Sequence, residues 1–238
     1  MAEAAFWGLV TAGSLWVGAV IATLRPSPRL IGLAMAFGAG ALIAAVAYEL
    51  VEDAFATDLE LAALGFAVGA LTFYAGDWAI DRRGGHGRKG MSGEDQLAGS
   101  ASAIVLGTVL DGIPESFVLG ASLVQEGVVP IAVVVGVFVS NVPEALSGTA
   151  GLIAAGWTRM RVFGMWTTVV VVSVLAAIAG YVLLDSMGST GGAFVTAFAA
   201  GALLVMLADT LMPEAFQLGG RETGLVTALG FAVGFALS

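Results

Sequence analysis

The chain of 238 residues is 58% hydrophobic and only 11% charged, and its mean hydropathy is +0.96. This composition excludes an ordinary water-soluble domain, because apolar runs long enough to cross a bilayer, about 20 residues each, recur along the whole sequence. The net charge of −9 disfavours nucleic acid as a partner, and the absence of cysteine excludes disulfides and thiolate ligands. The sequence therefore predicts an all-α polytopic membrane protein, with residues 1–238 forming a single transmembrane domain in the lipid bilayer.

Eight transmembrane helices are expected, over residues 5–24, 31–55, 60–80, 99–124, 128–153, 161–184, 193–216 and 222–238. All nine basic residues lie in loops that follow odd-numbered spans. The positive-inside rule then places these loops in the cytoplasm and both termini outside. The long polar segment 81–98 becomes a cytoplasmic loop between the third and fourth helices. It contains the single histidine, His86, which we interpret as a solvated loop residue.

An internal repeat relates spans two and three to spans seven and eight. Residues 36–42 (AFGAGAL) match 197–203 (AFAAGAL), and the GFAVG of 65–69 recurs at 230–234. The copies are five spans apart, an odd number, so they cross the membrane in opposite directions. Inverted repeats around a pair of discontinuous helices are typical of secondary transporters, whose substrate site lies near the midplane of the bilayer.

Two proline-containing motifs lie in spans four and five. The first runs Asp111-Gly-Ile-Pro-Glu115 and the second Ser140-Asn-Val-Pro-Glu144. Proline inside a helix lacks an N–H and displaces the carbonyl four residues earlier, so a facing pair of broken helices is expected. Asp111 and Glu115 share one helix face because they are four residues apart. At 1.5 Å per residue from opposite membrane surfaces, both motifs reach the midplane.

Three carboxylates at that depth require a compensating positive charge. No Lys or Arg lies in spans four and five to pair with them, so a proton or a metal ion must supply the charge. If the cation is a divalent metal, these two motifs offer it a ring of oxygen ligands, namely Asp111, Glu115, Ser140, Asn141 and Glu144.

Further acidic residues mark the two ends of a route through the membrane. The expected entrance is at the outer end of span two, with Glu49, Glu52 and Asp53. The expected exit is on the inner side, with Asp77, Asp209 and Glu214. In the register of the repeat, Asp53 corresponds to Glu214, so the entrance and the exit are related by the internal symmetry.

The paired Pro-Glu motifs, the outer termini and the long loop after span three resemble the ZIP (Zrt/Irt-like) family of divalent metal transporters. The resemblance implies eight helices in a 3+2+3 arrangement, a homodimer, and transport of zinc, iron, manganese or cadmium towards the cytoplasm of a prokaryote through its inner membrane. The family motif in span four usually begins His-Asn, where this chain has Asp111 and Gly112. The imidazole is replaced by oxygen, which favours harder ions such as Mn²⁺ or Fe²⁺. Gly112 removes a ligand of the second metal position that some members have.

We therefore expect a transporter that works by alternating access, with a metal ion as its cargo and no prosthetic group. The alternative is a proton-coupled exporter of a small organic solute, with Glu115 and Glu144 as proton carriers. An enzyme is disfavoured, because a helical zinc-protease motif needs two histidines and the chain has one, outside the spans.

Overall fold

The computed structural model describes residues 1–82, 101–125 and 127–238, and all regular structure in these ranges is helical. This confirms the expectation of an all-α chain. Six described segments are long and apolar enough to cross a membrane: Ala2–Leu24, Pro28–Thr57, Leu59–Ile80, Ile131–Ala154, Arg159–Met187 and Gly191–Leu237. Such helices are compatible with an integral membrane protein. His86 and most of the predicted loop 81–98 lie outside the described residues.

The first half of the chain follows the predicted spans closely. Its elements are α1 (Ala2–Ile21), the 3₁₀ turn η1 (Ala22–Leu24), α2 (Pro28–Ala45), the π-helical η2 (Val46–Val51), α3 (Glu52–Thr57), α4 (Leu59–Ile80), α6 (Ala101–Gln125) and α7 (Ile131–Ala154). Ser27 and Asp58 cap α2 and α4, because each side chain accepts a hydrogen bond from the backbone N–H three residues later.

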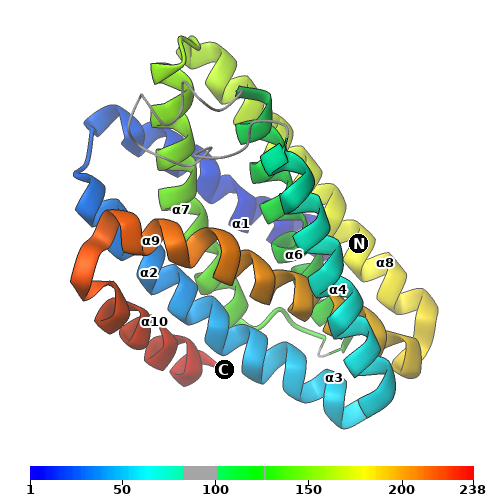
Figure 1. Cartoon of the computed structure of the whole chain (residues 1–238). Coiled ribbons are helices and arrows are strands. Elements are labelled where there is room, and N and C mark those ends of the chain that lie inside the picture. The colour runs from blue at the N-terminus through cyan, green and yellow to red at the C-terminus, as the bar shows by residue number, and fades with distance from the viewer. Residues whose placement is uncertain (83–100, 126) are drawn as a thin grey trace.

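The second half contains one unexpected feature. Its elements are α8 (Arg159–Met206), the π-helical η4 (Leu207–Leu211), α9 (Met212–Gly219), the 3₁₀ turn η5 (Gly220–Glu222) and α10 (Thr223–Leu237). The predicted spans six and seven are joined by helical backbone within α8, whose ribbon nevertheless turns back on itself in Figure 1. The first part of α8 contacts α1 and α6, and its second part contacts α4.

The prediction of broken helices at the two proline motifs is wrong. Pro114 lies inside a continuous α6 and Pro143 inside a continuous α7. A proline removes one backbone hydrogen bond without ending a helix when neighbouring helices hold the flanking turns in place. Here α7 packs closely against both α1 and α2, which supply that support.

The internal repeat is present in the backbone itself. The two π-helical segments begin at Val46 and Leu207, an offset of 161 residues, and this is also the offset between Ala36 and Ala197 in the matching sequences. A π turn is rare and its position is specific. Its occurrence at equivalent positions therefore supports a structural relationship between the two parts of the chain, beyond a shared Ala and Gly content.

The close helix contacts obey the same offset. A Cβ atom added to either of two glycines would overlap a backbone carbonyl oxygen: Gly40 that of Thr227, and Gly69 that of Phe198. The equivalent pairs, each 161 residues away, are Gly201 with Phe66 and Gly230 with Phe37. Thus α10 packs on α2 as α4 packs on the second part of α8 (Figure 1).

These contacts correct the register of the repeat in its second helix. The match of 65–69 with 230–234 has an offset of 165 residues, four more than the contacts show. Four residues are about one helical turn. Since glycines four apart lie on one face, the sequence pattern alone does not distinguish a register from its neighbour one turn away.

The glycine contacts lead to a stability prediction. Gly201→Ala places a methyl group against the carbonyl oxygen of Phe66, which is backbone and cannot turn aside. We expect the free energy of unfolding to fall by about 1–3 kcal/mol, as for other overpacked sites. Thermal unfolding of the purified protein in detergent measures the effect. The matched control is Gly164→Ala in α8, where no atom lies within 4 Å of the added group. Equal melting temperatures for the two variants would contradict the packing described above.

Candidate functional site

The predicted ligands lie in the interior of the molecule. The five side chains of the two proline motifs are all at most 7% exposed: Asp111, Glu115, Ser140, Asn141 and Glu144. They come from α6 and α7, whose other residues are mainly apolar. Burying a carboxylate is costly unless hydrogen bonds, a proton or a cation compensate for the lost water. The buried carboxylates of α6 and α7 therefore need polar contacts within the interior of the protein.

One such contact joins the two motifs. Ser140 Oγ of α7 lies 3.3 Å from Glu115 Oε1 of α6, and it also lies 3.0 Å from the backbone carbonyl oxygen of Val137. A hydroxyl has a single proton, so its donation is shared between these two oxygens. The structure thus brings a predicted ligand from each motif together, across the interface between the two proline-containing helices.

Helix α1 also contributes to the site, which sequence reasoning missed. Asn141 Nδ2 donates a hydrogen bond of 3.3 Å to the backbone carbonyl oxygen of Thr11, a residue that is fully buried. With the nitrogen bonded to α1, the amide oxygen of Asn141 remains as its other polar atom. In the sequence, the hydroxyl residues Thr11 and Ser14 within the apolar first span could have indicated a polar contact of this helix. In the structure both are buried.

A line of polar side chains follows one face of α7. Ser140, Glu144 and Ser147 are spaced by four and three residues, so they project from the same side of the helix. At the far end of this line, Ser147 Oγ donates a hydrogen bond of 2.7 Å to Glu214 Oε1 of α9. Glu214 was predicted as an exit residue, and in this structure it is buried against Ser147 of α7.

The other predicted exit residues differ in their exposure. Asp77 in α4 is buried, and Asp209 in η4 is exposed. Helix α4 contacts α6 near this position, since a Cβ at Gly76 would lie 3.2 Å from a methyl group of Leu110. Of the three predicted exit residues, Asp77 and Glu214 are therefore buried and Asp209 is exposed.

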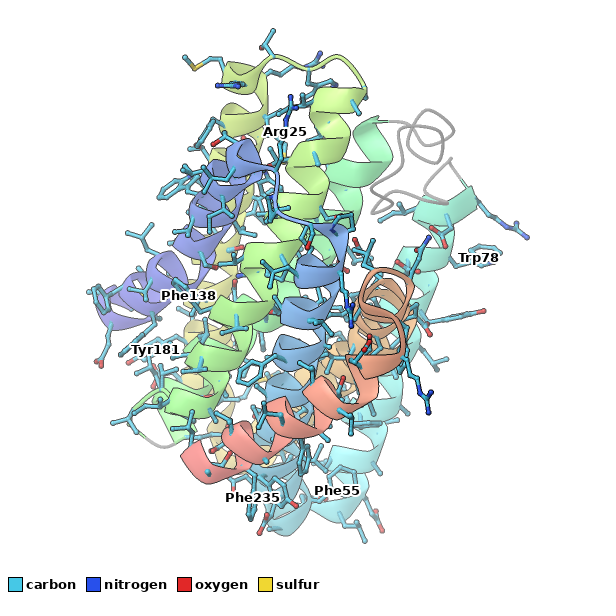
Figure 2. The ribbon with its side chains drawn as sticks, turned by 90° about the vertical axis from the view of Figure 1, so that its left-hand side faces the viewer. Arg25, Phe55, Trp78, Phe138, Tyr181 and Phe235 are labelled. Atoms are coloured by element: carbon cyan, nitrogen blue, oxygen red, sulfur yellow. The ribbon has the colours of Figure 1, made fainter. Side chains whose placement is uncertain are left out.

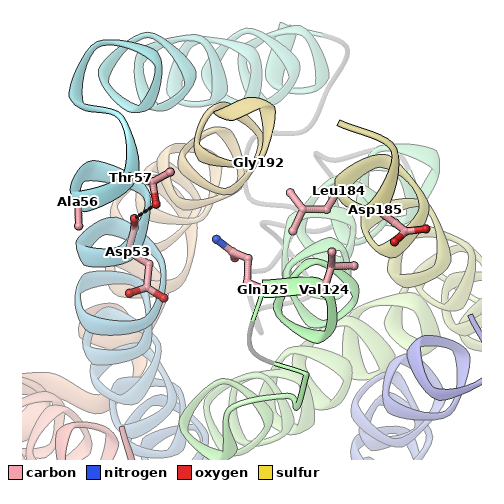
Figure 3. A pocket seen from close by; sticks show the side chains of 8 residues that line it. All are labelled: Asp53, Ala56, Thr57, Val124, Gln125, Leu184, Asp185 and Gly192. Carbon is pink, nitrogen blue, oxygen red and sulfur yellow. Dashed lines mark hydrogen bonds between the residues drawn. The ribbon is translucent and has the colours of Figure 1, made fainter. Parts of the chain in front are cut away.

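The predicted entrance borders a cavity. Glu52 and Asp53 are exposed and Glu49 is half-buried. Asp53 lines a cavity of about 520 Å³, shown in Figure 3, together with Gln125 of α6 and Asp185 of α8. Thr57 Oγ donates a hydrogen bond to the carbonyl oxygen of Asp53, one turn earlier. None of the five motif residues lines this cavity, and Asp185 is an acidic lining residue that the sequence analysis did not identify.

The geometry of a metal centre is not preformed in the described part of the chain. Within residues 1–82, 101–125 and 127–238, no three His, Cys, Asp or Glu side chains gather as a metal ion would require. Asp111, Glu115 and Glu144 are thus buried in the same helix pair without forming a ready three-carboxylate cluster. Binding a cation here requires the hydroxyl and amide oxygens of Ser140 and Asn141, or a movement of the carboxylates.

Gly112 occupies a position that faces α8. A Cβ atom at this residue would lie 3.2 Å from Ser173 Oγ of α8. A longer side chain there would begin against α8, whereas Glu115 meets Ser140 at the α7 interface. The position is therefore poorly placed to supply a ligand between the two motifs.

Comparison with known proteins adds no assignment, since no family model matches the chain and no curated protein matches its sequence significantly.

The contact between α7 and α1 is open to a direct test. Asn141→Asp replaces the donating amide by a carboxylate that, when ionised, cannot donate to the carbonyl of Thr11. We expect unfolding in detergent to require about 1–3 kcal/mol less, the cost of an unsatisfied buried group. Thr11→Val keeps the carbonyl and loses only hydroxyl bonds within α1, so it should be affected less. If Asn141→Asp is as stable as the original chain, the hydrogen bond between Asn141 and Thr11 does not contribute to stability and this prediction is wrong.

Proposed function

We propose that this protein is a membrane transporter that moves divalent metal cations towards the cytoplasm by alternating access. The observation that carries the proposal is the meeting of two proline-containing helices at Glu115 and Ser140, deep among apolar residues. Acidic residues within membrane-spanning helices are costly and therefore mark ion or substrate pathways by default. A purely structural protein has no need for carboxylates at this depth.

The proposed architecture is eight transmembrane helices in a 3+2+3 inverted repeat. Support comes from the constant offset of 161 residues that relates the π segments and the glycine contacts on either side of α6 and α7. Transporters built from inverted repeats place their substrate site at the repeat interface, and α6 and α7 occupy that place in the sequence. The homodimer is proposed on the resemblance to ZIP transporters alone.

The chemistry of the site favours relatively hard ions. Every proposed ligand supplies oxygen: the carboxylates of Asp111, Glu115 and Glu144, the amide of Asn141 and the hydroxyl of Ser140. Oxygen ligands suit Mn²⁺ and Fe²⁺ better than an imidazole- or thiolate-containing site does, while Zn²⁺ is bound by either class. Gly112 faces α8, which supports a site for one ion rather than two.

A second candidate, proton-coupled export of a small organic solute, is favoured by one observation. The described residues contain no cluster of three metal-ligating side chains, and Glu115 and Glu214 each accept a hydrogen bond from a serine. A carboxyl group that carries a proton requires hydrogen-bonding neighbours, whereas a metal site requires several carboxylates close together. Measuring metal bound to the purified protein distinguishes the two candidates.

The proposed orientation has structural support. An ion pair of 2.6 Å joins Arg29, after span one, to Glu222, after span seven, so these two loops share one side. The guanidinium groups of Arg82 and Arg161 stack on Trp78 and Trp157, each 3.8 Å from the ring centroid. In Figure 2, Arg25 lies near one end of the bundle, and Phe55 and Phe235 lie near the other. Arg is typical of the cytoplasmic side of a membrane, and Trp is typical of the boundary on either side.

Transport should depend on the carboxylates of both motifs. Glu115→Ala and Glu144→Ala each remove a charged ligand, so we expect each to abolish uptake into proteoliposomes, tested with Zn²⁺, Mn²⁺, Fe²⁺, Co²⁺, Cd²⁺ and Mg²⁺. Glu60→Ala, at an exposed acid in the first turn of α4, is the matched control and should transport normally. Uptake that survives both buried substitutions would place the cation elsewhere. A chain that transports no metal, but whose carboxyl groups drive proton flux, would favour the second candidate.

The orientation should be visible by labelling, because the chain has no cysteine of its own. A cysteine replacing Gly87 should react with a membrane-impermeant reagent only from the cytoplasmic side, and one replacing Ala2 only from outside. Labelling of intact and opened cells measures this directly. The reverse pattern would exchange the proposed entrance and exit.

A further inference from the structure

The hydrogen bond between Ser147 and Glu214 is the starting point. It joins α7 to α9 at 2.7 Å, and the two residues are 1% and 7% exposed. A hydrogen bond to a charged acceptor is worth more than one between neutral groups, and leaving that acceptor buried without it is costly. The bond therefore holds the Glu214 side chain on the polar face of α7, while the backbone of α9 packs against α2.

Helix α9 is a short segment with irregular backbone at both of its ends. It has eight residues and lies between two irregular backbone segments. The π-helical η4 precedes it, and Gly220, with φ of +73°, follows it. A π turn has an extra residue in the helical ladder, and a left-handed residue interrupts the helix at the other end. Rotation at these two points changes the tilt of α9 while its internal hydrogen bonds stay intact.

The repeat supplies a counterpart in a different state. Asp53 of α3 lies 161 residues before Glu214, the offset of the repeat, and α3 likewise follows a π-helical segment. Yet Asp53 is exposed and lines the cavity of Figure 3, whereas Glu214 is buried on Ser147. Two equivalent acids thus occupy opposite environments in one structure. Inverted-repeat transporters exchange the conformations of their two halves during transport.

We propose that Ser147 is a positioning residue that closes the inner end of the route by holding Glu214, with η4 as the hinge of α9. Release of this hydrogen bond tilts α9 away from α7, and the outer cavity beside Asp53 closes in the same transition. The inference rests on the proposed transport function, because it assigns Glu214 and Asp53 to the two sides of a transport cycle.

Two single cysteines report the two ends. Ala215 in α9 is fully buried, and Ala56 in α3 is exposed and lines the outer cavity. Each is replaced by cysteine, and the rate of reaction with a water-soluble maleimide is measured in detergent without metal. Ser147→Ala should raise the rate at position 215 by at least about tenfold, as expected for loss of a hydrogen bond to a charged group. The same substitution should lower the rate at position 56.

The opposite sign at the two reporters separates a gate from simple loosening of the fold. Ser147→Thr keeps the hydroxyl and should restore both rates. Ser122→Ala is the matched control: it removes a buried serine hydroxyl that bonds within its own helix, to the carbonyl of Val118, and should change neither rate. If Ser147→Ala does not fold, Glu214→Ala with the same reporters provides the same test. Rates that rise at both positions, or that stay unchanged, overturn the proposal.

The proposal and the proposed function fail separately. The labelling contains no metal, so its outcome does not depend on which ion is carried. Metal uptake by the original chain without reciprocal labelling would support the transport function and contradict the gate at Ser147 and Glu214. Reciprocal labelling without uptake of any tested metal would support the gate and contradict metal as the cargo.

Discussion

The burial of carboxylates among apolar helices is the constraint on which the rest of this structure depends. Asp111, Glu115, Glu144 and Glu214 are each at most 7% exposed. In hydrocarbon a bare carboxylate is expensive, so the surrounding helices must provide hydrogen bonds, or a proton or cation must neutralise the charge. Two serines of α7 answer part of this requirement, Ser140 to Glu115 and Ser147 to Glu214. Helix α7 therefore supplies hydrogen bonds to buried carboxylates on two neighbouring helices, α6 and α9.

The close packing around α7 depends on small residues. At Gly18 a Cβ atom would overlap the carbonyl oxygen of Val142, one residue before Pro143, so α1 touches the backbone of α7 beside the motif. At Gly38 it would lie 2.9 Å from the backbone of Ser140, so α2 does the same. Because water is absent from the bilayer core, helices associate through such contacts rather than through the hydrophobic effect. The glycines thus bring three helices close enough to hold the buried polar groups in place.

The internal repeat links the packing of the helices to the proposed mechanism. Its two copies share their π segments and their glycine contacts, but their acids lie in different environments, Asp53 beside a cavity and Glu214 against Ser147. Two related halves in unequal states are the physical basis of alternating access. The asymmetry lies at α3 and α9, since the longer helices next to them, α2 with α10 and α4 with the second part of α8, make equivalent glycine contacts.

The sequence by itself determined the all-helical fold with helices apolar enough to cross a membrane, the existence of the repeat and the polar residues of α6 and α7. Long apolar runs have few other stable forms in lipid, where every backbone group must be hydrogen-bonded within a helix, and a charged residue inside such a run is conspicuous. Only the tertiary structure decided that α6 and α7 continue through their prolines, that α10 is shifted by one turn from its sequence match, and that Thr11 and Glu214 belong with the buried polar groups. These features arise from contacts between helices far apart in the chain. Residues three or four positions apart lie on the same face of a helix, so the sequence pattern alone does not determine which turn of one helix contacts which turn of another.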